Sequence, residues 1–113
     1  MAFVAIPFHE MNRVPMLDGS KHQTARTKRY AHVGDRFKAF GAIFEVLTVE
    51  LYSLWVVRAD WKAEGFKSPE GFEEGWKRLH PRKGFDPEQV VWVHKFKKVE
   101  VLAVQPELSE VQG

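Results

Sequence analysis

The chain has 113 residues and a formal net charge of +2, and this length fits one domain with a hydrophobic core of its own. It contains no cysteine, which excludes a disulfide scaffold, a thiolate zinc site and a cysteine nucleophile. No segment has the apolar length of a membrane span, and the N-terminus lacks the basic lead of a signal peptide. We therefore expect a soluble protein of the reducing cytoplasm that does not contact membranes.

The N-terminal half predicts short strands and one short helix. Residues 3–6 form an apolar run that reads as a strand and stops at Pro7, and residues 9–18 have helical spacing although Pro15 interrupts them. The side chains expected to face the core from that helix are Met11, Val14 and Leu17. Further strands are expected over residues 22–28, 36–40 and 43–57, the last as one long bent strand or as two.

The C-terminal half predicts helices followed by a long strand. Residues 59–64 predict a short helix, and a longer one begins at Ser68, a good N-cap, and ends before Pro81. Its inward side chains at helical spacing are Phe72, Trp76 and Leu79. The remaining segments are a loop over residues 82–88, a strand over 90–104 and a polar tail over 106–113.

Strands at both ends of the chain therefore surround a central helical segment. Helices do not alternate with strands, so the order excludes a doubly wound parallel sheet. We predict a single α+β domain over residues 1–105, built on a small, mostly antiparallel β-barrel with short helices around it. The polar tail over residues 106–113 is expected to lie outside this domain.

The segment from Gly19 to Arg26 gathers several reactive side chains. A glycine permits a tight turn, and Lys21, Thr24 and Arg26 then supply an amine, a hydroxyl and a fixed cation. Thr24 and Arg26 share one face of an extended strand. A threonine becomes a nucleophile when a base takes its proton, and a lysine can be that base when burial and a neighbouring cation lower its pKa. The ordinary alternative is a strand threonine beside a surface lysine.

Motifs for metals and common cofactors are missing from the sequence. The five histidines do not have the spacing of known zinc motifs, and the glycines form neither a Walker A loop nor a dinucleotide fingerprint. We therefore expect neither a metal nor a cofactor.

Four motifs follow one another along the chain. They are G-x-K-x-x-x-x-R at Gly19, Lys21 and Arg26, the turn Gly34-Asp35, the acidic helical segment 64–72 followed by Trp76, and the strand 91–96. Together they resemble the ASCH domain, a branch of the PUA-like β-barrel superfamily. The resemblance covers residues 3–101 and implies a β-barrel with a cleft beside the first helix, which binds RNA or a modified nucleoside.

One small bacterial subgroup of that family consists of N(4)-acetylcytidine amidohydrolases. These enzymes use a lysine, a threonine three residues later and a glutamate in the helical segment, and the matching residues here are Lys21, Thr24 and Glu64. The resemblance implies that Thr24 is the nucleophile, Lys21 its base and Glu64 the group that moves a proton to the departing amine. The residues expected to bind the substrate are Gly19, Arg26, Lys28 and Trp61.

A second hypothesis is an RNA-binding module, with or without ribonuclease activity. The stretch from Lys21 to Lys38 holds six basic residues and a single acid, Asp35, and such a stretch can bind phosphates. Trp61 could then stack on a base. The ordinary alternative is a solvated surface for the charges and core packing for the tryptophan.

Overall fold

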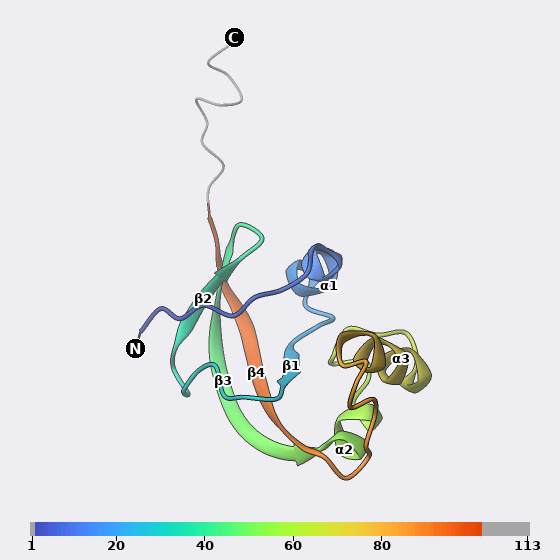
Figure 1. Cartoon of the computed structure of the whole chain (residues 1–113). Helices are drawn as coiled ribbons and strands as arrows, with labels where there is room; N and C mark the ends of the chain where they lie inside the picture. Colours follow the sequence, from blue (N-terminus) through green and yellow to red (C-terminus); the bar gives the residue numbers. More distant parts are fainter. Residues whose placement is uncertain (1, 103–113) are drawn as a thin grey trace.

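A four-stranded antiparallel sheet, in the order β1-β4-β3-β2, is the frame of the molecule (Figure 1). The computed structural model describes residues 2–102. The strands are β1 (Gln23–Arg26), β2 (Arg36–Ala39), β3 (Ala42–Ser53) and β4 (Val90–Val101). The long strands β3 and β4 curl, so the sheet forms a half-barrel. The predicted α+β class with a small antiparallel barrel is confirmed.

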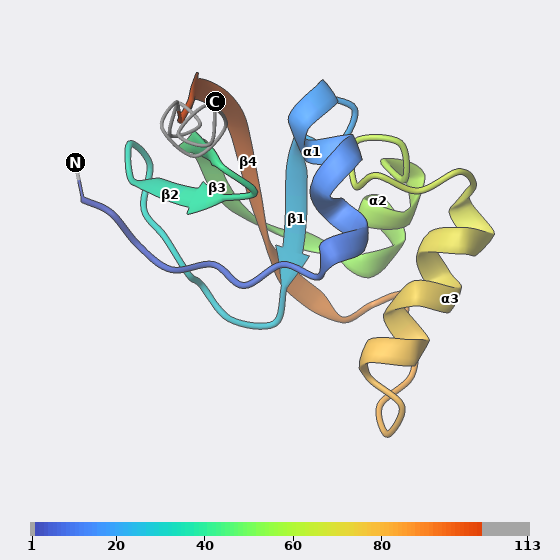
Figure 2. The same ribbon diagram turned by 90° about the horizontal axis from the view of Figure 1, so that it is seen from above.

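The helices gather beyond the β1 edge of the sheet, whereas β2 lies at the opposite edge (Figures 1 and 2). They are η1 (Glu10–Asn12), α1 (Arg13–Asp18), α2 (Leu54–Ala59) and α3 (Pro69–Leu79). The predicted start of α3 is confirmed, because the Ser68 hydroxyl accepts the Gly71 N–H at 2.9 Å. Within residues 2–102, none of the helices combines the length and the hydropathy that crossing a bilayer requires.

The inward face predicted for residues 9–18 is wrong for Met11 and Val14, whereas Leu17 packs against the core as predicted. Met16 is the buried side chain of α1, whereas Met11 and Val14 are 72% and 68% exposed, and Leu17 is partly buried. Met11 lies in the 3₁₀ turn η1 ahead of α1, where the angular spacing of side chains differs from that of an α-helix. Leu79 is also exposed, at the last residue of α3, although its spacing predicts an inward side chain.

Two strand predictions need correction. The run 3–6 makes only an isolated bridge, between Phe3 and Arg36. Strand β3 ends at Ser53, whose hydroxyl accepts the Val56 N–H and begins α2. Residues 54–57 are therefore helical, because the serine cap outweighs the β-propensity of the valines.

These shifts also change the prediction for the next segment. The helix expected over residues 59–64 is the end of α2 followed by turns. The strand expected over residues 90–104 ends at Val101. The polar tail predicted over residues 106–113 lies outside the described residues.

Two hydrophobic clusters form the core. The first centres on Phe37, Phe44 and Phe96, whose ring centroids lie 5.3–5.5 Å apart. The second joins the sheet to α2 and α3 through Ala25, Leu54, Val57, Phe72, Trp76, Val91 and Val93. Ala25 of β1 belongs to the second cluster, whereas Met16 and Tyr30, which precede and follow β1 in the sequence, pack in the first. The candidate site is built around this strand.

Candidate functional site

The outer edge of β1 carries the site. As the last strand of the sheet, β1 pairs with β4 on one side only. On its free edge, the Gln23 N–H donates to the Ala63 carbonyl at 3.2 Å, and the Ala25 N–H donates to the Glu64 carboxylate at 3.3 Å. The Gln23 carbonyl accepts from the Lys21 amine at 3.0 Å. Two ionisable side chains thus satisfy the backbone groups that another strand would use.

Lys21 is almost wholly buried, with 5% of its surface exposed. Its Nζ donates to the carbonyl oxygens of Gln23 and Glu64, at 3.0 and 2.7 Å. These two acceptors leave a third position on Nζ, which is a proton in the ammonium form and a lone pair in the neutral amine. Burial lowers the Lys21 pKa and the nearby Arg26 cation lowers it further, while Glu64 acts in the opposite direction. The shift is in the direction that a general base requires.

Space for Lys21 depends on Gly65. This glycine has φ +92°, and a Cβ added to it would lie 3.0 Å from the Lys21 Cβ and 3.1 Å from its Cδ. A larger residue would therefore be strained in its backbone and would also press on the lysine. In the sequence, Gly65 directly follows the helix expected over residues 59–64, where a glycine is typical of a helix end, and nothing in the local pattern indicates its contact with Lys21.

Glu64 lies beside Lys21 with 3% of its surface exposed. One carboxylate oxygen accepts the Gln23 side-chain amide at 2.9 Å, and the other accepts the Ala25 N–H. Burial raises the Glu64 pKa, although Lys21, Gln23 and Ala25 each oppose this rise. The carboxyl group therefore holds its proton to a higher pH than an exposed glutamate does.

The Thr24 side chain leaves β1 on the face opposite to that of Gln23 and points toward Arg26. The Arg26 Nε donates to the Thr24 Oγ1 at 3.2 Å, and its Nη2 donates to the Pro7 carbonyl at 2.7 Å. The guanidinium lies 4.9 Å from the Phe8 ring centroid and 5.5 Å from that of Tyr30. Because Thr24 Oγ1 accepts from a fixed cation, its own proton is directed elsewhere and is available to a base.

A cavity of about 750 Å³ joins these groups. Lys21, Thr24, Arg26 and Glu64 all line it, and its lining also includes Met11 and Leu79, which are exposed to solvent. Its aromatic lining comes from Phe8, Tyr30, Phe66, Phe72 and Trp76. In Figure 2, β1 lies beside α1 and the N-terminal segment, with α3 farther out. The cavity draws its residues from the N-terminal segment, η1, β1 and its flanking residues, the turn segment before α3, and α3 itself. Apolar walls with a few convergent polar groups are typical of a small-molecule site.

The structure thus brings together Lys21, Thr24, Glu64 and Arg26, and it places the other predicted binding residues outside the cavity lining. Gly19 is the left-handed residue that ends α1. Lys28 is exposed and lies over the Tyr30 ring, and Trp61 packs against the second core cluster. Sequence reasoning missed Phe8 and Tyr30, which carry no motif of their own.

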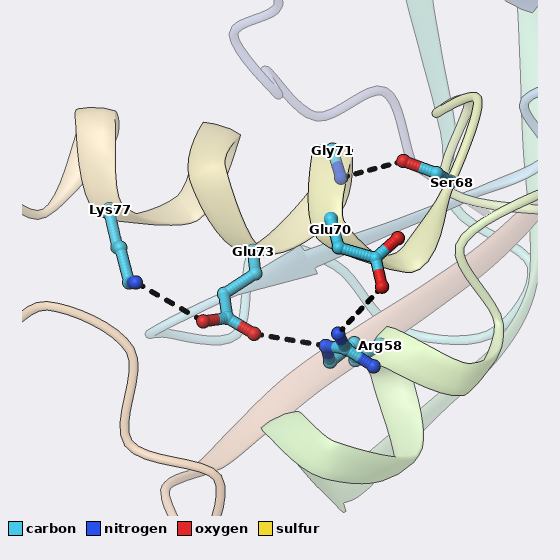
Figure 3. Close-up of polar contacts among 6 residues, drawn as sticks. All are labelled: Arg58, Ser68, Glu70, Gly71, Glu73 and Lys77. Carbon is cyan, nitrogen blue, oxygen red and sulfur yellow. Dashed lines mark hydrogen bonds and ion pairs between the residues drawn. The ribbon is translucent and has the colours of Figure 1, made fainter.

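Two glutamates of α3, Glu70 and Glu73, form ion pairs on the surface and do not line the cavity. Glu73 pairs with Arg58 at 3.0 Å and with Lys77 at 3.1 Å, while Glu70 lies 3.5 Å from Arg58 (Figure 3). The two pairs of Arg58 join α2 to α3, and the pair of Glu73 with Lys77 lies within α3. Of the described residues that line the cavity, only Glu64 carries a carboxylate.

The basic stretch between Lys21 and Lys38 does not form one continuous free surface. Lys21 and most of Arg26 are buried at the cavity, and Arg36 pairs with Glu45 at 3.1 Å. Arg29 donates to the Ala31 carbonyl and lies 5.4 Å from the Trp92 ring. Much of the charge that favours phosphate binding in the sequence is therefore engaged in contacts within the fold. In residues 2–102, histidines and carboxylates do not gather in the groups of three that hold a metal ion.

Comparison with known proteins places the fold. No protein-family model and no curated protein matches the chain. Among solved structures, an ASCH domain from Lactobacillus crispatus superposes with a TM-score of 0.68 at 15% identity, covering 88% of this chain and 79% of that one. The hypothetical protein PH0355 gives 0.66 at 14% identity over 88% of this chain and 100% of that one. Protein EF3133 from Enterococcus faecalis gives 0.61 at 17% identity, over 92% and 82%. The chain therefore has the fold of an ASCH domain.

Proposed function

We propose that this protein is an amidohydrolase that removes the acetyl group from N(4)-acetylcytidine or from a closely related N-acylated cytidine. One observation carries the proposal: Lys21, Thr24 and Glu64 line a single open cavity. The ASCH fold supports it, because the resemblance in sequence assigns a lysine, a threonine and a glutamate to this reaction in one subgroup of that family. The threonine and the glutamate distinguish an amidohydrolase from an ASCH domain that only binds.

The first step is attack of the Thr24 hydroxyl on the acetyl carbon. Lys21, whose pKa burial lowers, takes the hydroxyl proton in its neutral form as the oxygen bonds to the carbonyl. No hydrogen bond joins Lys21 Nζ to Thr24 Oγ1 among the described residues, and the proposal requires the two groups to come within hydrogen-bond reach when the substrate binds. Arg26, already within 3.2 Å of the Thr24 oxygen, stabilises the oxyanion that develops beside it.

Glu64 completes the transfer. Its raised pKa lets it donate a proton to the cytidine nitrogen as the C–N bond breaks, which releases cytidine and leaves an acetyl ester on Thr24. Water then attacks the ester and gives its proton to the Glu64 carboxylate. The Thr24 oxygen leaves and recovers a proton from the Lys21 ammonium group, so acetic acid departs and all three side chains return to their starting state.

The cavity suits a flat, acylated pyrimidine. Its volume of about 750 Å³ lies within the range of roughly 300–1,000 Å³ that is common for ligand sites. Phe8 and Tyr30 come from one core cluster, and Phe72 and Trp76 come from the other. Aromatic side chains stack on unpaired bases, so these walls favour a nucleobase over an aliphatic amide.

The direct test is incubation of the purified protein with N(4)-acetylcytidine. We expect cytidine and acetate in equal amounts, followed by chromatography and by an acetate assay. In samples quenched during turnover, peptide mass spectrometry should find the acetyl group on Thr24. A protein that binds the nucleoside and releases no acetate over prolonged incubation is not this hydrolase.

Replacing Gly65 by alanine is expected to reduce turnover by about 100-fold, because the new methyl group displaces the Lys21 side chain. The left-handed backbone should also cost about 1–3 kcal/mol of stability. Gly34→Ala is the matched control, since Gly34 has the same φ of +92° and open space around the added Cβ. Steady-state kinetics and thermal unfolding of both variants separate the effects: similar losses of stability are expected, with a loss of turnover only at Gly65. Equal turnover in the two variants would contradict the placement of Lys21 by Gly65.

A further inference from the structure

His94 is a fully buried histidine of β4 that contacts the backbone of two residues of the site, Thr24 and Tyr30. It lies in β4 with 0% exposure, opposite Thr24 of β1 and Val49 of β3. Its Nε2 accepts the Tyr30 backbone N–H at 3.0 Å, and its Nδ1 lies 3.4 Å from the Thr24 carbonyl oxygen. One imidazole therefore joins the strand that carries the nucleophile to the segment that carries Tyr30.

These two partners fix the protonation state of the ring. A backbone N–H can only donate, so the Nε2 that receives it has no proton of its own. The Nδ1 then carries the proton and donates it to the Thr24 carbonyl. Only the neutral Nδ1–H form satisfies both contacts.

Tyr30 links His94 to the nucleophile by a second route. The Tyr30 ring lines the cavity, and the Arg26 guanidinium lies 5.5 Å from its centroid. Arg26 in turn donates to the Thr24 hydroxyl. His94 thus acts on Thr24 through its carbonyl and also through the Tyr30–Arg26 contact.

We propose that His94 is a positioning residue of this site, which in its neutral Nδ1–H form holds Thr24 and Tyr30 in register and on protonation releases Tyr30. A protonated ring presents an N–H at Nε2, where it meets the Tyr30 N–H, and two donors repel each other. Tyr30 and the Arg26 guanidinium beside it then lose their fixed places. The catalytic readout of this proposal rests on the hydrolase function proposed above, whereas its structural readout does not.

The surroundings of His94 favour the neutral ring. Burial lowers the His94 pKa below its ordinary value of 6.5, and the cations Arg26 on β1 and Arg29 in the following loop lower it further, whereas hydrogen bonding to the backbone of Thr24 and of Trp92 acts in the opposite direction. On β3, the residue paired with His94 is Val49, which carries no charge. Because the folded protein binds fewer protons at this ring than the unfolded chain, this contribution to stability is present above pH 6.5 and is lost as the pH falls toward the lowered pKa.

The structural test uses the full-length wild-type protein and nuclear magnetic resonance. The ring nitrogens of His94 should show the Nδ1–H form at neutral pH. On acidification, the Tyr30 amide signal should move with the same midpoint as the His94 ring. An Nε2–H ring, or a Tyr30 amide that does not follow the ring, would overturn the proposal whether or not the protein hydrolyses acetylcytidine.

Three variants test the consequence for catalysis. His94→Leu removes both contacts and should lower kcat by about 10- to 100-fold with a smaller change in KM. His94→Gln offers an amide oxygen to the Tyr30 N–H and has no acid titration, so it should recover part of kcat and keep the Tyr30 signal constant at acidic pH. His32→Gln is the control, because the His32 side chain is 75% exposed.

The outcomes distinguish the two proposals. Wild-type kinetics and an unchanged pH profile in both His94 variants would reject the positioning role while leaving the hydrolase intact. Absence of hydrolysis in the wild type would reject the hydrolase, and the resonance titration would still decide whether His94 holds Tyr30.

Discussion

Replacing Thr24 by alanine is expected to reduce acetate release from N(4)-acetylcytidine by about 1,000-fold or more. The substitution removes the oxygen that attacks the acetyl carbon and leaves the rest of the cavity in place. Thr24 lies within an edge strand held by β4, and alanine keeps its backbone pairing, so the fold should persist. Binding of the substrate should change far less than turnover, which equilibrium binding and steady-state kinetics on the same sample can separate.

Two further substitutions sharpen this test. Thr24→Ser keeps a hydroxyl and should retain measurable turnover. Thr48→Ala removes a threonine hydroxyl from β3, outside the cavity lining, and should leave turnover unchanged. If Thr24→Ala released acetate at the wild-type rate, water would have to be the attacking group and the acetyl-enzyme step would be wrong.

Local signals in the sequence predicted much of this site. The serine–proline pair at Ser68 and Pro69 begins α3 as expected, because capping needs only neighbouring residues. Thr24 and Arg26 share a face of β1 because strand geometry repeats every two residues, and the structure joins their side chains directly. The spacing of residues in the sequence does not predict that Glu64 lies beside Lys21; only the resemblance to the ASCH domain implies that the two act at one site.

Tertiary contacts supply what the sequence could not show. His94 reaches Tyr30 and Thr24 across 64 and 70 positions of the chain, and such pairing has no local pattern. The same limit explains the basic stretch, whose charges look free in the sequence although Arg36 is paired with Glu45 and Lys21 is buried. Residues 54–57 were mistaken for strand because valine and tryptophan favour strands on average, whereas here a serine cap and burial against α3 decide for helix.

Replacing Glu64 by glutamine is expected to lower turnover by about 100-fold or more while the protein stays folded. The glutamine oxygen can accept the Ala25 N–H as the carboxylate does. The Gln23 amide can rotate so that its oxygen accepts the new N–H₂ group, in place of the bond that it now donates. Glutamine cannot donate a proton to the departing amine. Breakage of the C–N bond should therefore become the slow step.

The pH profile of this variant gives a second readout. An ionised Glu64 raises the Lys21 pKa, and glutamine cannot do so, so the Lys21 pKa should fall. The limb of the rate profile on which activity rises as Lys21 loses its proton should therefore move to lower pH. Glu70→Gln is the matched control, since Glu70 is exposed and lies near Arg58 on the surface, and it should change neither the rate nor the profile. Full turnover in Glu64→Gln would mean that another group transfers the proton. If the limb of the pH–rate profile did not move, the charge of Glu64 would have no effect on the Lys21 pKa.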